Sequence, residues 1–249
     1  MVSSSQAPTP PARTASALWP PGSLWRLSAA LNGYRHSRGE CLATQALAER
    51  RFRVLGAAVD GRLPVALVED GYPCWLCLTA LADQGVLPAQ FRPWLWPTPS
   101  IRAALPQVIA FAEAAMARPN RYLWGGAGAP HYDCSGLTQA AFASCGIWIP
   151  RDACQQERFC QPVAVRVDEF SLLQQGDLIF FGSGRRCTHV GLSLGCGRYL
   201  HCSGRAHGRD GIGLDRLDSH ARDPVSVHYR AALRGAGRVV RSHDGSQLA

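Results

Sequence analysis

The chain has 249 residues and 47% of them are hydrophobic, so we expect a packed core that forms one large or two small domains. Its 26 basic residues are all arginine and outnumber the 18 acidic ones, but they are spread along the chain, which argues against a nucleic-acid partner. No run approaches the ~18 apolar residues of a membrane span, and the ten scattered cysteines indicate reduced thiols instead of a disulfide framework.

Residues 1–21 are rich in Ser, Ala, Pro and Thr and contain no apolar run. They lack both the charged start and the hydrophobic stretch of a secretory signal. We therefore expect a disordered lead-in and a cytoplasmic protein.

Residues 22–97 alternate short apolar runs with turn residues, which predicts a small β-barrel. The segment 42–50 fits either a strand or a short helix. Within 69–76, two carboxylates, a glycine and a proline are typical of a turn that presents Tyr72 outward. The alternative, which these residues by themselves favour, is a packing tyrosine in a barrel loop. Cys74 and Cys77 form a lone CxxC pair without a second ligand pair, so we reject a zinc site there.

Residues 92–99 contain three prolines and two tryptophans, a composition that predicts an ordered, extended linker. We expect Trp94 and Trp96 to pack between the two halves of the protein.

Residues 98–242 begin with helical patterns and end with strand patterns, which predicts an α+β domain. The first helix runs from 98 or 100 to 116, with Pro106 at its start or at a kink. Asp133 is a suitable N-cap for a second helix that ends near Gly146, and a third begins at Ala153. Strands are expected at 178–182, 188–194 and 199–203, and residues 243–249 form a tail.

Cys134 is the first residue of the second helix. Unpaired backbone N–H groups and the helix dipole favour a thiolate there, and such settings lower a cysteine pKa from ~8.5 to roughly 3.5–7.5. The alternative is that Cys134 is one more small buried hydrophobe.

Side-chain alternation on the last two strands places two histidines together. If Val190, Leu192, Leu200 and Cys202 are buried, then His189 and His201 share the opposite face, within ~4.5–8 Å of each other. Gly191 leaves room over that face. If the helix that carries Cys134 packs there, the thiol meets His189 and His189 meets His201, which gives a nucleophile, a base and an orienting group.

Metal binding is a rival use of the cysteines and histidines between 187 and 207. Cys202 points away from His201, however, and no spacing matches a zinc finger. We therefore expect neither a metal nor a cofactor.

These motifs resemble the NlpC-type bacterial cell-wall cysteine peptidases. The likeness rests on Tyr122-Leu-Trp-Gly-Gly, Asp133-Cys-Ser-Gly, Gly176-Asp-Leu-Ile-Phe-Phe, Thr188-His-Val-Gly and Tyr199-Leu-His. The first half is similar to the bacterial Src-homology-3-like barrel of a cyanobacterial-type branch that cleaves γ-D-glutamyl-L-diamino acid bonds. The resemblance implies a papain-like peptidase domain over 98–242, preceded by a barrel over 22–97.

In that branch, the resemblance implies that Cys134 attacks the γ-D-glutamyl carbonyl, His189 moves the proton and His201 orients His189. It further implies that Tyr72 closes one end of the groove and, with Asp133 and Ser135, recognises the free amine of an N-terminal L-Ala. Tyr122 would lie near the oxyanion, and Arg151 and Asp152 would line the pocket.

The expected activity is therefore cleavage of short murein peptides in cell-wall recycling, without nucleic-acid or membrane partners. The sequence departs from the family's pattern at two positions that affect how a substrate fits: Cys74 lies close to Tyr72, and Ala153 offers no hydroxyl to the pocket. Two alternatives stay open at this point. One is an inert wall-peptide binding or adaptor protein, and the other is an acyltransferase or amidase of related chemistry.

Overall fold

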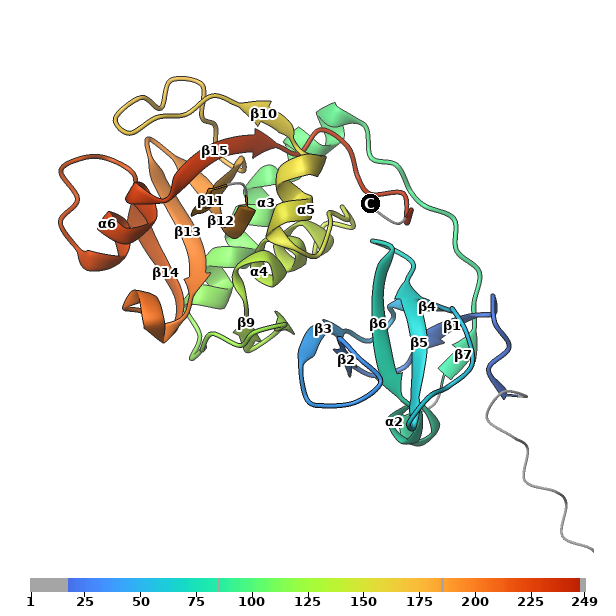
Figure 1. Cartoon of the computed structure of the whole chain (residues 1–249). Helices are drawn as coiled ribbons and strands as arrows, with labels where there is room; N and C mark the ends of the chain where they lie inside the picture. Colours follow the sequence, from blue (N-terminus) through green and yellow to red (C-terminus); the bar gives the residue numbers. More distant parts are fainter. Residues whose placement is uncertain (1–17, 85, 185, 247–249) are drawn as a thin grey trace, which may run out of the picture.

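The computed structural model describes residues 18–84, 86–184 and 186–246, which form two units joined by an extended linker (Figure 1). Residues 1–17 of the predicted lead-in and 247–249 of the predicted tail lie outside the described residues. The barrel begins earlier than residue 22, because Trp19 is buried against Trp25 and Phe52.

The first unit is a seven-stranded sheet with the strand order β3-β2-β6-β5-β4-β1-β7. Its buried core includes Phe52, Val65 and Leu76. The ambiguous segment 42–50 contains a strand, and a short helix that was not predicted follows β6. The elements are β1 (Leu24–Leu27), β2 (Leu31–Tyr34), β3 (Leu42–Ala46), β4 (Arg51–Val54), β5 (Arg62–Leu67), β6 (Tyr72–Cys77), α2 (Leu78–Gln84) and β7 (Val86–Pro88).

The second unit confirms the predicted α+β class. Its antiparallel sheet has the order β10-β15-β11-β12-β13-β14. The strands are β10 (Gln161–Val163), β11 (Leu178–Ser183), β12 (Arg186–Gly195), β13 (Arg198–Ser203), β14 (Gly211–Arg216) and β15 (Leu233–Arg238), with a small β8–β9 pair (Ala127–Gly128 and His131–Tyr132). The helices are α3 (Thr98–Met116), which continues through Pro106, α4 (Cys134–Ala143), α5 (Ala153–Phe159), η1 (Arg205–His207) and α6 (Pro224–Ala231).

Helices α3, α4 and α5 cover one face of this sheet, and α6 covers the other (Figure 1). The apolar side chains of α4 pack on Val190, Leu192, Leu200 and Cys202. The expectation that α4 lies over the histidine face is therefore wrong, because the apolar helix buries the apolar face of the sheet. The histidine face is covered by α6, and Gly191 makes room there for the ring of Tyr199.

Polar contacts fix the barrel on the second unit. The hydroxyl of Tyr72 donates to Asp152 at 3.2 Å, and the amide of Gln139 donates to Asp70 at 2.7 Å. Arg151 donates to the hydroxyl of Thr44 on β3 at 3.0 Å. Tyr72 is buried in this seam instead of pointing outward to solvent as expected.

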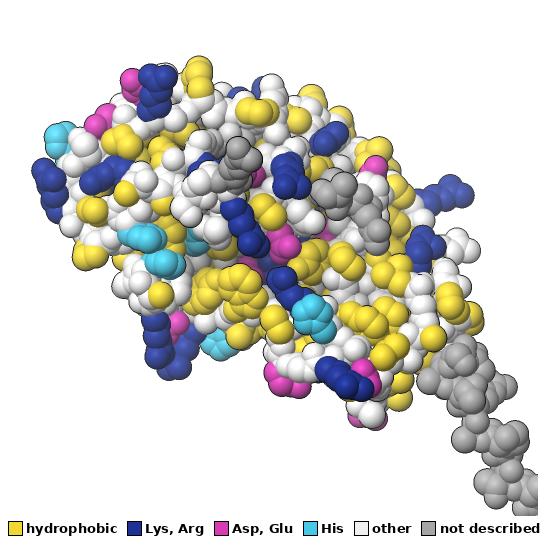
Figure 2. Space-filling view, in the orientation of Figure 1, with side chains coloured by type: hydrophobic (Ala, Val, Ile, Leu, Met, Phe, Trp, Pro, Cys, Tyr) yellow, Lys and Arg dark blue, Asp and Glu magenta, His cyan; other side chains and the backbone are white. Residues whose placement is uncertain are grey.

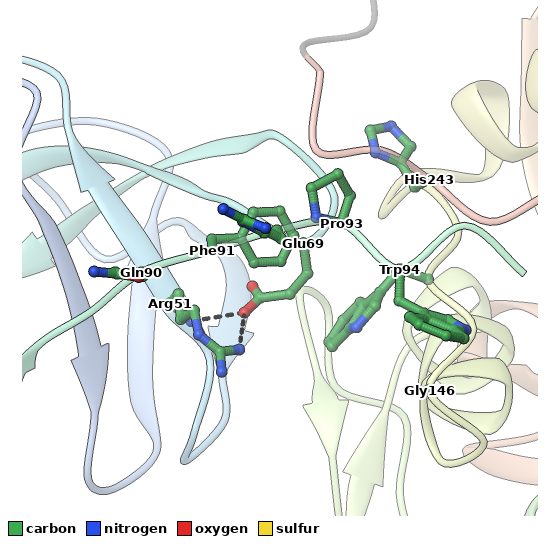
Figure 3. Close-up of a pocket in the computed structure, with 10 residues that line it drawn as sticks. Arg51, Glu69, Gln90, Phe91, Pro93, Trp94, Gly146 and His243 are labelled. Carbon is green, nitrogen blue, oxygen red and sulfur yellow. Dashed lines mark hydrogen bonds and ion pairs between the residues drawn. The ribbon is translucent and has the colours of Figure 1, made fainter.

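The linker tryptophans differ from each other. Trp96 donates its indole N–H to the carbonyl of Gly146 and packs against the core of the second unit, whereas packing between the two halves was expected. Trp94 is 74% exposed, so its expected packing between the halves is wrong. Figure 3 shows Trp94 beside Gly146 at the edge of a small hollow of about 220 Å³, across from Glu69 and Arg51.

Candidate active site

A cavity of about 830 Å³ lies where the two units meet and contains both predicted reactive groups. Cys134 reaches it from the start of α4 and His189 from β12. Further lining residues come from the barrel, from α5, from the β11–β12 turn and from η1 and α6. They include Arg35, Ala43, Tyr122, Asp152, Cys187, Arg205, His207 and Tyr229.

Cys134 begins α4 because Asp133 caps the helix, accepting a hydrogen bond from the backbone N–H of Gly136 at 2.7 Å. Any side chain at Gly136 would collide with the carbonyl oxygen of Gly126, at 2.0 Å from the Cβ position. The backbone N–H of Val190, the residue after His189, donates to the Cys134 sulfur. The turn that carries the thiol is therefore held tightly against β12.

The electrostatics of Cys134 differ from the expected thiolate. Burial, helped by the neighbouring Asp133 carboxylate, raises the pKa of the Cys134 thiol to about 12. Burial also lowers the pKa of His189 well below its usual value. The resting state is therefore a neutral thiol and a neutral imidazole, because burial disfavours the charged form of each group.

The predicted pairing of the two histidines is confirmed. Nε2 of His189 lies 2.7 Å from Nδ1 of His201, and the rings are nearly perpendicular at 87°. Tyr229 on α6 stacks on His189 with ring centroids 4.2 Å apart. His201 is completely buried and His189 is nearly so. Only Nδ1 of His189 remains to face the thiol.

Sequence reasoning missed the next group in this chain. Nε2 of His201 lies 2.6 Å from the carboxylate of Asp215 on β14, which also accepts hydrogen bonds from Arg209 and Ser226. Asp215 pairs with Tyr199 across the β13–β14 ladder. Extending the strand alternation from Tyr199 and His201 to the 211–216 segment would have placed Asp215 on the histidine face.

Arg151 and Asp133 form a buried ion pair behind the nucleophile. Both nitrogens of the guanidinium fork donate to Asp133, at 3.0 and 2.8 Å, and one also donates to Ser135. Asp133 further accepts from the backbone N–H of Gly125. The side chain of Arg151 is 1% exposed and does not line the cavity, so its expected pocket role is wrong. Its charge is committed to holding Asp133 and Ser135.

Asp152 is the carboxylate available to a ligand at the barrel end of the cavity. It lies beside Tyr72, and burial raises its pKa above the usual value. Burial raises the pKa of both Tyr72 and Asp152, and Arg35, in the segment after β2, partly offsets this rise in each. No sequence pattern indicates a site role for Arg35, because the contact between the two units brings it to the cavity.

Tyr122 lines the cavity near the nucleophile. Burial, together with the proximity of Cys134, raises the pKa of its hydroxyl, so it stays protonated and can donate a hydrogen bond. Within residues 18–84, 86–184 and 186–246, no three His, Cys, Asp or Glu side chains are gathered as a metal site would need. No helix in these ranges is long and apolar enough to span a bilayer. Figure 2 shows basic side chains scattered over the visible face.

Comparison with known proteins identifies both units. Residues 119–231 match the NlpC/P60 family, and residues 33–81 match the bacterial dipeptidyl-peptidase Sh3 domain. A γ-D-glutamyl-L-lysine dipeptidyl-peptidase from Bacillus cereus is 42% identical over 84 residues, which are 32% of this chain and 23% of that protein. A probable endopeptidase from Corynebacterium glutamicum is 37% identical over 100 residues, which are 40% of this chain and 44% of that protein.

The chain thus spans less than half of the length of both curated relatives. Among solved structures, an NlpC/P60 family protein from Bacillus cereus is 24% identical, with a TM-score of 0.43, and the match covers 88% of this chain and 64% of that one.

Proposed function

We propose that this chain, in which residues 119–231 match the NlpC/P60 family, is a cell-wall peptidase that cleaves the γ-D-glutamyl-L-diamino acid bond of short murein peptides with a free N-terminal L-Ala. The observation that carries this proposal is the barrel's place in the cavity. Arg35 and Ala43 of the barrel line the same cavity as Cys134 and His189, so one end of the groove is closed. A closed end suits a short peptide terminus better than an intact polymer.

The charges at the closed end match the two ends of such a peptide unit. An L-Ala-γ-D-Glu unit carries an ammonium group and a free α-carboxylate. In our proposal, Asp152, held by the Tyr72 hydroxyl, binds the ammonium and Arg35 binds the carboxylate. Asp133 and Ser135 also line the cavity, but both are already engaged by Arg151, which leaves Asp152 as the carboxylate that we assign to the ammonium.

The proposed reaction begins with proton transfer. His189 takes the thiol proton on Nδ1 as the Cys134 sulfur attacks the γ-carbonyl carbon. The backbone N–H of Cys134 at the helix start and the Tyr122 hydroxyl stabilise the oxyanion. His189 then gives the proton to the departing amine of the diamino acid, and water attacks the thioester to release the dipeptide. A neutral resting pair is compatible with this order, because the charges form only during the attack.

Two biological features remain predictions. A peptidase that requires a free amino terminus acts on peptides already released from the wall, so we propose a role in murein peptide recycling. A cytoplasmic location would suit this role.

The activity is tested with L-Ala-γ-D-Glu-L-Lys and its N-acetylated form, with product release followed by mass spectrometry. We expect cleavage of the free peptide only, and complete loss of cleavage in Cys134→Ser. Equal cleavage of both peptides would contradict recognition of the amine. Unchanged turnover by Cys134→Ser would rule out covalent catalysis.

The assignment of the ammonium to Asp152 has its own test. Tyr72→Phe removes one hydrogen bond to a charged group, which is worth about 1.5 kcal/mol or roughly tenfold in kcat/KM for the free peptide. Asp152→Asn should lose more than this, and both should narrow the preference for the free over the acetylated form. If Asp152→Asn still prefers the free peptide over the acetylated one, the ammonium is assigned to Asp133 instead.

A further inference from the structure

Behind the predicted nucleophile, base and orienting histidine, the structure holds a fourth polar side chain in line. Nε2 of His201 and the nearer carboxylate oxygen of Asp215 are separated by 2.6 Å. The Asp215 side chain is 1% exposed and does not line the cavity, so it cannot touch the substrate. It acts only through His201.

The hydrogen-bond chain fixes the position of every proton along it. A carboxylate only accepts, so the contact with Asp215 requires the proton of His201 to sit on Nε2. Nδ1 of His201 is then an acceptor, and the 2.7 Å contact requires His189 to carry its proton on Nε2. Nδ1 of His189 is thereby left unprotonated and free to accept the thiol proton.

We propose that Asp215 is a positioning residue that sets the tautomers of His201 and His189 and thereby presents Nδ1 of His189 to Cys134 as the base. The inference rests on the proposed cysteine-peptidase function. When the thiol proton moves to Nδ1, His189 becomes an imidazolium that keeps its Nε2–H bonded to His201. Asp215 keeps its bond to the Nε2–H of His201, so its negative charge stabilises the imidazolium without taking a proton.

Asp215 is itself held in a fixed orientation. Arg209 donates at 2.6 Å to the same carboxylate oxygen that meets His201, and Ser226 donates at 3.0 Å to the other oxygen. The Arg209 side chain is 28% exposed and lies at the outer end of this hydrogen-bond chain. Burial lowers the pKa of His201; Asp215 opposes this lowering and Arg209 adds to it, so the two charges act on this imidazole in opposite senses.

Other groups face the two rings and set the background of their titration. Tyr229 of α6 contacts both rings, and Tyr199 of β13 packs against His201. His207 of η1 and His228 of α6 lower the pKa of His189 when they are charged, and Asp223 raises that of His201. Cys134 lines the same cavity as His189. Asp215 also acts on Asp223, Tyr199 and Tyr229, and these side chains themselves are kept in both variants.

The test compares three variants in the full chain. Asp215→Asn removes the negative charge, and Arg209→Gln removes the positive one. Asp177→Asn is the matched control. Asp177 is also a buried carboxylate on this sheet that pairs with an arginine, Arg238, and the exposed fractions of the two side chains are 2% and 25%. It does not contact either histidine. The readouts are kcat, KM and the pH dependence of kcat/KM.

For Asp215→Asn we expect a loss of about 100-fold in kcat, the low end of what positioned acid–base groups contribute, with KM changed by less than about twofold. The acid limb of the profile, where His189 gains a proton, should move to lower pH by about one unit. Arg209→Gln should move the same limb to higher pH, and Asp177→Asn should move it in neither direction. A general loss of stability cannot produce shifts of opposite sign.

A second readout needs no peptide substrate. The rate at which iodoacetamide alkylates Cys134, followed by mass spectrometry of the peptide that contains it, depends on the same proton transfer to His189. The same opposite shifts are expected in its pH profile. If wild-type protein cleaves neither murein peptide while these shifts appear, the proposed function fails and the role of Asp215 stands.

The opposite pattern would overturn the inference. It fails if Asp215→Asn gives the wild-type pH profile in both assays, or if its loss of kcat equals that of Asp177→Asn. If Asp215→Asn does not fold, Arg209→Gln alone tests the inference. An acid limb of the kcat/KM profile that is not shifted in Arg209→Gln would then count against it.

Discussion

Arg151→Met should destabilise the protein far more than the loss of an ordinary ion pair. Arg151 is 1% exposed, and its guanidinium donates to Asp133, Ser135, Thr44 and the backbone of Gly126. Methionine fills a similar volume but leaves the Asp133 carboxylate buried without its cation. Breaking a buried pair in this way costs about 3–5 kcal/mol of unfolding free energy.

Urea denaturation followed by tryptophan fluorescence measures this loss. Arg234→Met is the matched control, because Arg234 bonds Glu157 at 2.9 Å with exposed fractions of 21% and 28%, and such pairs contribute about 1 kcal/mol or less. Adding Asp133→Asn to Arg151→Met should recover part of the loss, since the amide retains the helix cap without an unpaired charge. A loss in Arg151→Met no larger than that in Arg234→Met would refute the view that this buried pair holds the nucleophile's turn to the barrel.

Three further outcomes follow from the site. Because burial lowers the pKa of His189 well below 6.5, the base stays neutral as the pH falls to that value, and we expect kcat/KM to be flat down to about pH 6.5 and to decline only below it. A decline centred at or above that pH would contradict a buried neutral base. Gly136→Ala should lower the unfolding free energy by about 1–3 kcal/mol or more, because its Cβ would collide with the Gly126 carbonyl oxygen. Thermal denaturation measures this loss, and Gly235→Ala is the control because Gly235 has open space around it. Equal melting temperatures for the two variants would show that the turn around Gly136 accommodates a Cβ without loss of stability. Arg35→Gln should raise KM for the free peptide by about tenfold, because one charge-assisted hydrogen bond to the substrate is lost. The alkylation rate of Cys134 should stay unchanged. A reduced alkylation rate would instead show that the substitution disturbs the nucleophile.

The protonation state of Cys134 shows where local reasoning stops. The sequence places the residue at a helix start, and the structure agrees. The pKa depends instead on how much water reaches the sulfur and on which charges surround it. Burial and Asp133 together raise the pKa of the thiol, and both are properties of the packed molecule.

The sequence alone determined the local features of this protein. Helix α4 follows from its cap and its apolar spacing, and the shared face of His189 and His201 follows from the period of two in a strand, because both depend only on neighbours along the chain or on one adjacent strand. The side of the sheet covered by α4, the commitment of Arg151 to Asp133, and the arrival of Arg35 and Asp215 were decided by the tertiary structure. These depend on contacts between segments far apart in the chain, whose relative placement no local pattern encodes.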